Sequence, residues 1–122
     1  MRIHTKATNL DLTPAMTTYI EDKLGSLQKF LDSMEGGKTE VLARVEIART
    51  TKHHAKGPVY RVEVNLGLGQ SLVRVEEQGY DVRAVIDVIR DILQSKIVKF
   101  KEKLRPQDSK GEKLIRKNVR GK

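Results

Sequence analysis

The chain has 122 residues, of which 38% are hydrophobic, and this length allows one domain with one modest core rather than two independent ones. The absence of cysteine excludes disulfides and cysteine-ligated metal sites, and it gives secretion no support. Residues 96–122 contain 11 of the 24 Lys and Arg residues but only 3 of the 16 Asp and Glu residues, so the whole formal net charge of +8 lies there. An even distribution of positive charge would indicate only solubility, and this charge is not evenly distributed.

The first predicted elements are a strand and a helix. Residues 1–10 open with β-branched side chains and predict a short strand. Thr13 can then cap a helix whose first position suits Pro14. Apolar residues recur at spacings of three and four as far as Leu31, which predicts one continuous helix. Gly25 weakens this helix by about 1 kcal/mol relative to alanine.

Three further strands are predicted within residues 40–50, 59–67 and 70–77, where apolar and polar side chains alternate. Short connections between them favour an antiparallel sheet with one solvated face. The segment Gly67 to Ser71 superficially suggests a phosphate-binding loop. It lacks the Lys-Ser/Thr ending and leads into a strand, so it is interpreted as a hairpin turn.

A second helix is predicted to begin after Asp81 and to end before Pro106. Its apolar stripe consists of Val82, Ile86, Ile89, Leu93, Ile97, Phe100 and Leu104. On a helical wheel, basic residues frame this stripe on both sides. One flank has Lys96, Lys99 and Lys103, and the other has Arg83, Arg90 and Lys101. The face opposite the core is predicted to carry Asp87, Asp91 and Glu102.

The element order β-α-β-β-β-α predicts an α+β sandwich, in which two helices pack on one face of a mostly antiparallel four-stranded sheet, as in double-stranded-RNA-binding domains. We expect one domain, residues 1–104, followed by a basic flexible tail, residues 105–122. The N-terminal residues lack the apolar core of a signal peptide, and no apolar run approaches the ~18–20 residues that cross a bilayer. A cytoplasmic protein without a membrane partner is therefore expected.

The basic flanks of the second helix have two interpretations. Lysines beside an apolar stripe also occur on ordinary solvated helices, because their stems pack on the stripe while their charges stay in water. The adjoining tail extends the basic segment and favours a polyanionic partner. With 4% aromatic residues, base stacking is disfavoured as the main binding mode, so structured RNA held through its phosphates is the better fit.

No group of residues predicts catalysis. His53 and His54 are adjacent in an expected loop, where their side chains point apart, and no acid cluster or cysteine completes a site. Asp87 and Asp91 could bracket a metal, but the arginines beside them favour surface ion pairs. We therefore expect no enzyme activity, catalytic residue, metal, cofactor or small-molecule substrate.

Two helical segments carry sequence motifs in a fixed order. Residues 9–32, NLDLTPAMTTYIEDKLGSLQKFLD, contain a Thr-Pro-Ala step and a Leu-x-Lys-aromatic ending. Residues 80–103, YDVRAVIDVIRDILQSKIVKFKEK, contain an Ala-x-Ile-Asp step and a Lys-aromatic-Lys-Glu-Lys ending. In these motifs and in element order, residues 1–104 resemble the ribosome hibernation promoting factors and ribosome-associated inhibitors. Ala7 and Thr8 depart from the resemblance, because the family often has Gly-Arg there.

The resemblance implies a function. Family members bind the small ribosomal subunit at 16S rRNA near the decoding centre of the 70S ribosome. There they block mRNA and tRNA and inhibit translation under stress or in stationary phase. By position, rRNA binding is assigned to Arg90, Lys96, Lys99, Lys101, Lys103 and Arg105. The dimerising domain of long members is expected to be absent, and the tail is expected to lie along rRNA.

Three alternatives stay open. The chain could be a general structured-RNA-binding protein without ribosome specificity, which would bind any RNA duplex as well as it binds ribosomes. An RNA-processing enzyme would depend on His53 and His54. A membrane-surface protein would have to rely on the tail alone, because the apolar stripe of the second helix is needed for the core.

Overall fold

The computed structural model describes residues 1–32, 41–50 and 57–104. Within them the chain forms four strands and three helices in an order that agrees with the predicted one, except that two helices replace the expected first helix. In chain order they are β1 (Arg2–Thr8), α1 (Pro14–Gly25), α2 (Gln28–Asp32), β2 (Leu42–Arg49), β3 (Tyr60–Leu68), β4 (Ser71–Gly79) and α3 (Val82–Leu104).

The four strands form a single mixed sheet in the order β1-β2-β3-β4. β1 pairs with β2 in parallel, with Arg2 opposite Leu42. Both pairings β2–β3 and β3–β4 are antiparallel, which confirms the mostly antiparallel sheet. Parallel neighbours need a long crossover, and α1 and α2 lie in the connection from β1 to β2. The turn between β3 and β4 contains Gly69, whose φ of 61° favours glycine.

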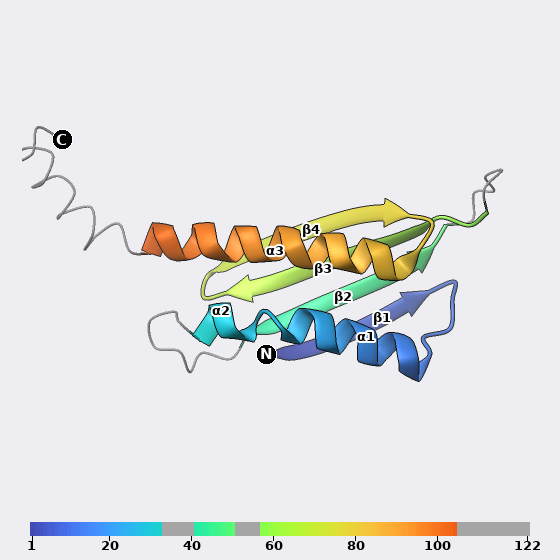
Figure 1. Cartoon of the computed structure of the whole chain (residues 1–122), viewed down its shortest axis with the longest axis horizontal. Coiled ribbons are helices and arrows are strands. Elements are labelled where there is room, and N and C mark those ends of the chain that lie inside the picture. The colour runs from blue at the N-terminus through green and yellow to red at the C-terminus, as the bar shows by residue number, and fades with distance from the viewer. Residues whose placement is uncertain (33–40, 51–56, 105–122) are drawn as a thin grey trace, which may run out of the picture.

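The sandwich has two layers, with the helices on one face of the sheet and the other face open (Figure 1). The alternation in β2 and β3 turns Val45, Ile47, Val62 and Val64 into the core, where each is buried. No polar or charged side chain is fully buried within the part of the chain that the structure describes. A sheet with one apolar face explains why the apolar sides of the helices pack against it.

The start of α1 confirms the predicted cap. The Oγ1 of Thr13 accepts a hydrogen bond from the backbone N–H of Met16 at 3.1 Å, and Pro14 occupies the first helical position.

The prediction of one continuous helix from Pro14 to Leu31 is wrong, because the first helix ends at Gly25. The backbone N–H of Leu27 bonds to the carbonyl of Leu24, three residues back, at 3.0 Å, and α2 begins only at Gln28. Glycine is a poor helix former, and Ser26 competes for the backbone: its Oγ donates to the carbonyl of Lys23 at 2.6 Å. Leu27 and Leu31 stay buried, so the break preserves the apolar face that defined the prediction.

Candidate nucleic-acid interface

Helix α3 is fixed to the sheet along its apolar stripe. The Oδ1 of Asp81 accepts a hydrogen bond from the backbone N–H of Arg83 at 3.0 Å. The backbone carbonyl of Asp81 accepts a second one from the N–H of Val85 at 3.0 Å, and the two bonds confirm the predicted start of the helix. The buried residues of the stripe are Val82, Val85, Ile86, Ile89, Leu93 and Ile97. The ribbon runs over β3 and β4, and its last part extends beyond the β3–β4 turn (Figure 1). The helix is therefore a rigid support for the side chains on its flanks.

The α3 lysines, Lys96, Lys99 and Lys103, lie on the flank of the stripe that faces away from α1. All three are exposed. None of them takes part in an ion pair among the residues that the structure describes. Their positive charges are thus available to an anionic partner. Three exposed ammonium groups on one helical flank can neutralise phosphates without reading base sequence.

Arg90 lies on the opposite flank and is occupied in a helix–helix contact. Its Nε donates to the Oγ of Ser26 at 3.0 Å, and its Nη1 is 3.3 Å from an oxygen of Asp91 and also donates to Gln94. Its side chain is 18% exposed. Lys101 is half-buried and already has an interaction. Arg105 lies outside the described residues. Of the other five expected rRNA-binding residues, Lys96, Lys99 and Lys103 share one flank of α3, whereas Arg90 and Lys101 lie on the other flank.

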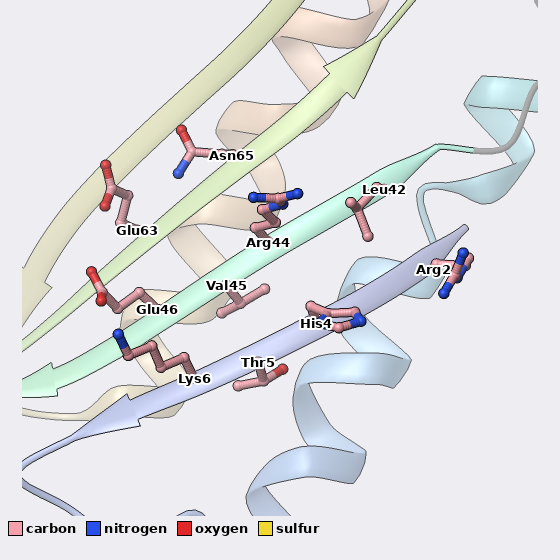
Figure 2. Close-up of a pocket in the computed structure, with 10 residues that line it drawn as sticks. All are labelled: Arg2, His4, Thr5, Lys6, Leu42, Arg44, Val45, Glu46, Glu63 and Asn65. Carbon is pink, nitrogen blue, oxygen red and sulfur yellow. The ribbon is translucent and has the colours of Figure 1, made fainter.

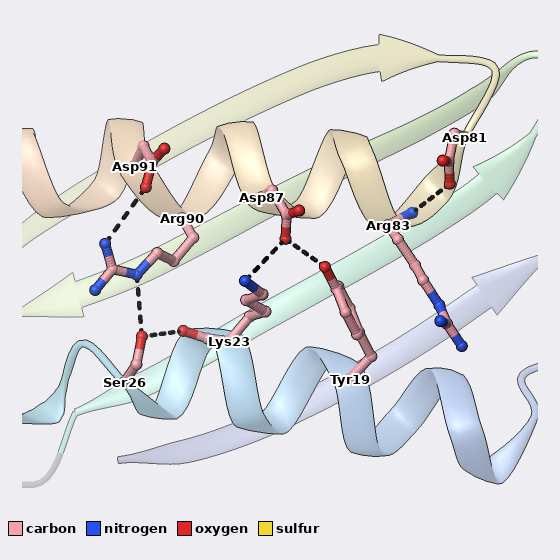
Figure 3. Close-up of polar contacts among 8 residues, drawn as sticks. All are labelled: Tyr19, Lys23, Ser26, Asp81, Arg83, Asp87, Arg90 and Asp91. Carbon is pink, nitrogen blue, oxygen red and sulfur yellow. Dashed lines mark hydrogen bonds and ion pairs between the residues drawn. The ribbon is translucent and has the colours of Figure 1, made fainter.

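Asp87 does not face away from the core as the helical wheel predicted, because it joins α3 to α1. Its Oδ1 accepts a hydrogen bond from the hydroxyl of Tyr19 at 2.6 Å and lies 3.4 Å from the Nζ of Lys23 (Figure 3). The wheel gives angles around α3 alone and does not show which side chains of α1 reach this flank, where Tyr19 and Lys23 contact Asp87. Asp91 does pair with Arg90, as expected for surface ion pairs.

Tyr19 is the centre of this contact and was missed by the sequence interpretation. The guanidinium carbon of Arg83 is 5.1 Å from the centre of its ring, and the Nζ of Lys23 is 5.6 Å away. The hydrogen bond to Asp87, together with partial burial, raises the pKa of the Tyr19 phenol above its ordinary value of 10.0. Tyr19 and Lys23 are four residues apart on α1, a spacing that marks one helical face.

On the open face of the sheet, the basic residues of β3 and β4 are neutralised. The Nη1 of Arg61 lies 2.7 Å from an oxygen of Glu76, and its Nη2 lies 3.7 Å from one of Glu46. Arg74 on β4 pairs with Glu63 on β3. These arginines therefore differ from the α3 lysines, because their charges already have partners.

The described residues show neither a candidate metal cluster nor a membrane-spanning helix. They contain no group of three or more His, Asp or Glu side chains that could hold a metal. None of their helices is long and apolar enough to cross a membrane. His53 and His54 lie outside the described residues. The feature that stands out among the described residues is the group of exposed α3 lysines, which form no ion pair there.

Residues 3–105 match the model of the protein family described as "Sigma 54 modulation protein / S30EA ribosomal protein". Curated relatives with the name "Ribosome hibernation promotion factor" are similar to this chain. The one from Deinococcus radiodurans is 28% identical over 103 residues, covering 84% of this chain and 50% of the relative. The one from Lactococcus lactis is 29% identical over 104 residues, covering 85% and 51%. The chain thus spans about half the length of the curated relatives it matches.

Two solved structures are similar in fold. The N-terminal domain of Protein Y from Thermus thermophilus superposes with a TM-score of 0.66 at 31% identity, covering 82% of this chain and 99% of that one. A ribosomal subunit interface protein from Coxiella burnetii gives a TM-score of 0.65 at 17% identity, covering 84% and 99%. The second likeness shows the fold alone.

Proposed function

The chain belongs to the family of sigma 54 modulation and S30EA ribosomal proteins, and from this membership we propose that it is a ribosome hibernation factor. This family comprises ribosome-associated factors and is not a known family of enzymes. In our proposal the protein binds 16S rRNA of the small subunit near the decoding centre in the cytoplasm. It thereby blocks mRNA and tRNA and inhibits translation under stress or in stationary phase.

The observation that supports this proposal best is the state of the α3 lysines. They are exposed, lie on one flank and form no ion pair within the described residues, whereas Arg61, Arg74 and Arg90 are each paired. Each lysine that neutralises a phosphate releases counterions, which strengthens binding and makes it salt-dependent. Lysine suits this task because its flexible stem lets a point charge adapt to an irregular phosphate surface.

The shape of the domain supports inhibition by occupancy. Packing on the buried stripe holds α3 straight, and its last part extends beyond the β3–β4 turn (Figure 1). In our proposal this projecting end enters a groove of folded rRNA, while the body of the sandwich fills the space that mRNA and tRNA need. No step of this mechanism breaks a bond, so no catalytic group is required.

The test is co-sedimentation with purified 30S and 50S subunits over a salt series. We expect the wild type to pellet with 30S and not with 50S. The Lys99→Gln/Lys103→Gln variant should bind more weakly than the wild type at 50 mM salt, and its salt slope should be smaller by about 1.4–1.8. Between 50 and 200 mM salt the variant should therefore lose roughly ten-fold less affinity than the wild type loses. The matched control, Lys29→Gln/Arg83→Gln, removes the same charge from positions over the rings of Phe30 and Tyr19, and it should bind nearly as the wild type does.

Two outcomes would contradict the proposal. Equal pelleting of the wild type with 30S and 50S would indicate a general structured-RNA-binding protein without ribosome specificity. An equal loss in the lysine variant and in its control would show that only net charge matters. Adding the protein to a cell-free translation reaction supplies the functional readout, and binding without inhibition would refute the occupancy mechanism.

A further inference from the structure

The open face of the sheet has a hollow of about 570 Å³ over β1 and β2 (Figure 2). This hollow lies in the layer opposite the helices, so it is separate from the α3 lysines. Its basic residues, which we name the β1–β2 basic cluster, are Arg2, His4, Lys6 and Arg44. Its acidic residues are Glu46 and Glu63.

The charge on this face is divided between its two halves. On the β3–β4 side, Arg61 pairs with Glu46 and Glu76, and Arg74 pairs with Glu63. Both acidic residues of the hollow are therefore held by arginines that lie outside it. On the β1–β2 side, Lys6 and Arg44 form no ion pair with any other residue that the structure describes.

Arg44 is the centre of that excess. Its cross-strand neighbours are His4 on β1 and Asn65 on β3, neither of which is an acid. Arg44 is exposed and makes no ion pair with any residue that the structure describes. Lys6 lies opposite Glu46, whose carboxylate is 3.7 Å from Arg61. A guanidinium with this freedom can present its planar fork of donors to a phosphate.

We propose that the β1–β2 basic cluster is a second phosphate-binding surface, which holds a strand of ribosomal RNA on the face opposite the α3 lysines. Only the choice of ribosomal RNA as the polyanion rests on the proposed function. The protein then binds RNA from two sides at once. Two weak contacts joined by one rigid domain give much tighter binding than either alone.

The form of the cluster favours an RNA backbone over other ligands. Arg2, His4 and Lys6 alternate along β1, so their side chains stand on one face about 7 Å apart in a row. A row of evenly spaced basic groups matches a chain of repeated anions better than a compact solute. No Phe, Tyr or Trp lines the hollow, and its largest charged groups are the guanidinium and ammonium groups of Arg2, Lys6 and Arg44, so the main contact is to phosphates.

The experiment measures binding of Lys6→Gln/Arg44→Gln to 30S subunits and to a short RNA hairpin over a salt series. The same control, Lys29→Gln/Arg83→Gln, removes two charges from the helical layer and leaves in place the arginines that pair with Glu46 and Glu63. A rescue variant, Lys6→Arg/Arg44→Lys, keeps both charges. We expect the test variant to bind more weakly than the wild type at 50 mM salt, with a salt slope smaller by about 1.4–1.8, so that it loses roughly ten-fold less affinity than the wild type between 50 and 200 mM salt. The control and rescue variants should bind nearly as the wild type does.

The outcomes separate this inference from the proposed function. If Lys6→Gln/Arg44→Gln bound both probes as the wild type does, or if the control lost as much, the second surface would be refuted while 30S selectivity could stand. If the wild type showed no preference for 30S but hairpin binding still depended on Lys6 and Arg44, the surface would stand and the proposed function would fail. Dependence seen only with phosphatidylserine vesicles would overturn the choice of RNA.

Discussion

Gly79 at the end of β4 lies close to the side chain of Val85 on α3. A Cβ atom built at this position would lie 2.8 Å from the Cγ2 of Val85, which is shorter than real Cβ contacts. Val85 is buried in the first turns of α3, and a β-branched side chain cannot easily rotate away. Gly79→Ala must therefore displace α3 or distort Val85.

Overpacking of this kind typically costs 1–3 kcal/mol of unfolding free energy, so we expect Gly79→Ala to be destabilised by about that amount. The backbone of Gly79 is not among those with positive φ, so alanine is not penalised by backbone conformation. The matched control is Gly67→Ala in β3, where no heavy atom lies within 4 Å of the added Cβ. This control should be neutral or stabilised by about 0.4–1 kcal/mol through the unfolded state.

Urea denaturation followed by far-ultraviolet circular dichroism measures both variants. A loss of 1 kcal/mol should also lower Tm by roughly 4–8 °C in a domain of this size. Val85→Ala removes the clashing methyl group, so the double variant with Gly79→Ala should be more stable than the sum of the single changes by roughly 0.5–3 kcal/mol. Strict additivity of the two changes would refute the steric reasoning.

Three other outcomes are expected. Ile89→Asp should prevent folding, because it places a charge at a position that is 0% exposed. The control, Val88→Asp, changes a position that is 48% exposed and should fold. Circular dichroism measures the folding of both variants, and equal folding would contradict the packing described. In an ultraviolet titration Tyr19 should ionise above its ordinary pKa of 10.0, and Asp87→Asn should lower its pKa toward that value. The raised pKa means that the neutral phenol of Tyr19 stabilises the folded state below pH 10, and this stabilisation is lost as the pH rises through the folded-state pKa. In urea titrations at rising alkaline pH, the free energy of unfolding should therefore fall more for the wild type than for Tyr19→Phe. Deleting residues 105–122 should reduce the salt slope of 30S binding, and an unchanged slope would show that the tail does not contact rRNA.

Much of the fold could be predicted because it depends on local patterns. Alternation at Val45 and Ile47, the Thr13 cap and the stripe of α3 each follow from spacing that a single element imposes. The break after Gly25 could not be predicted in this way, because the apolar spacing continues through it to Leu31. Burial of Leu27 and Leu31 is compatible with one helix or two, and only backbone hydrogen bonding distinguishes them.

The candidate site was predictable only in part, for a related reason. The wheel correctly placed the α3 lysines on one flank, since that depends on α3 alone. It could not tell that the other flank meets α1, where Asp87 binds Tyr19 and Arg90 binds Ser26 (Figure 3). The β1–β2 basic cluster was missed because its members come from two strands about 40 residues apart, although the alternation of Arg2, His4 and Lys6 was a visible signal.

The position of β1 at the end of the sheet has a consequence for self-association. Among the strands that the structure describes, β1 pairs with β2 alone, so its outer edge presents backbone groups that a second copy of the chain could pair with. Edge-to-edge pairing of two copies would bring two rows containing Arg2 and Lys6 side by side, and like charges across neighbouring strands repel. The basic side chains of β1 thus disfavour pairing between the edges of two copies, and added salt weakens this protection by screening the charges.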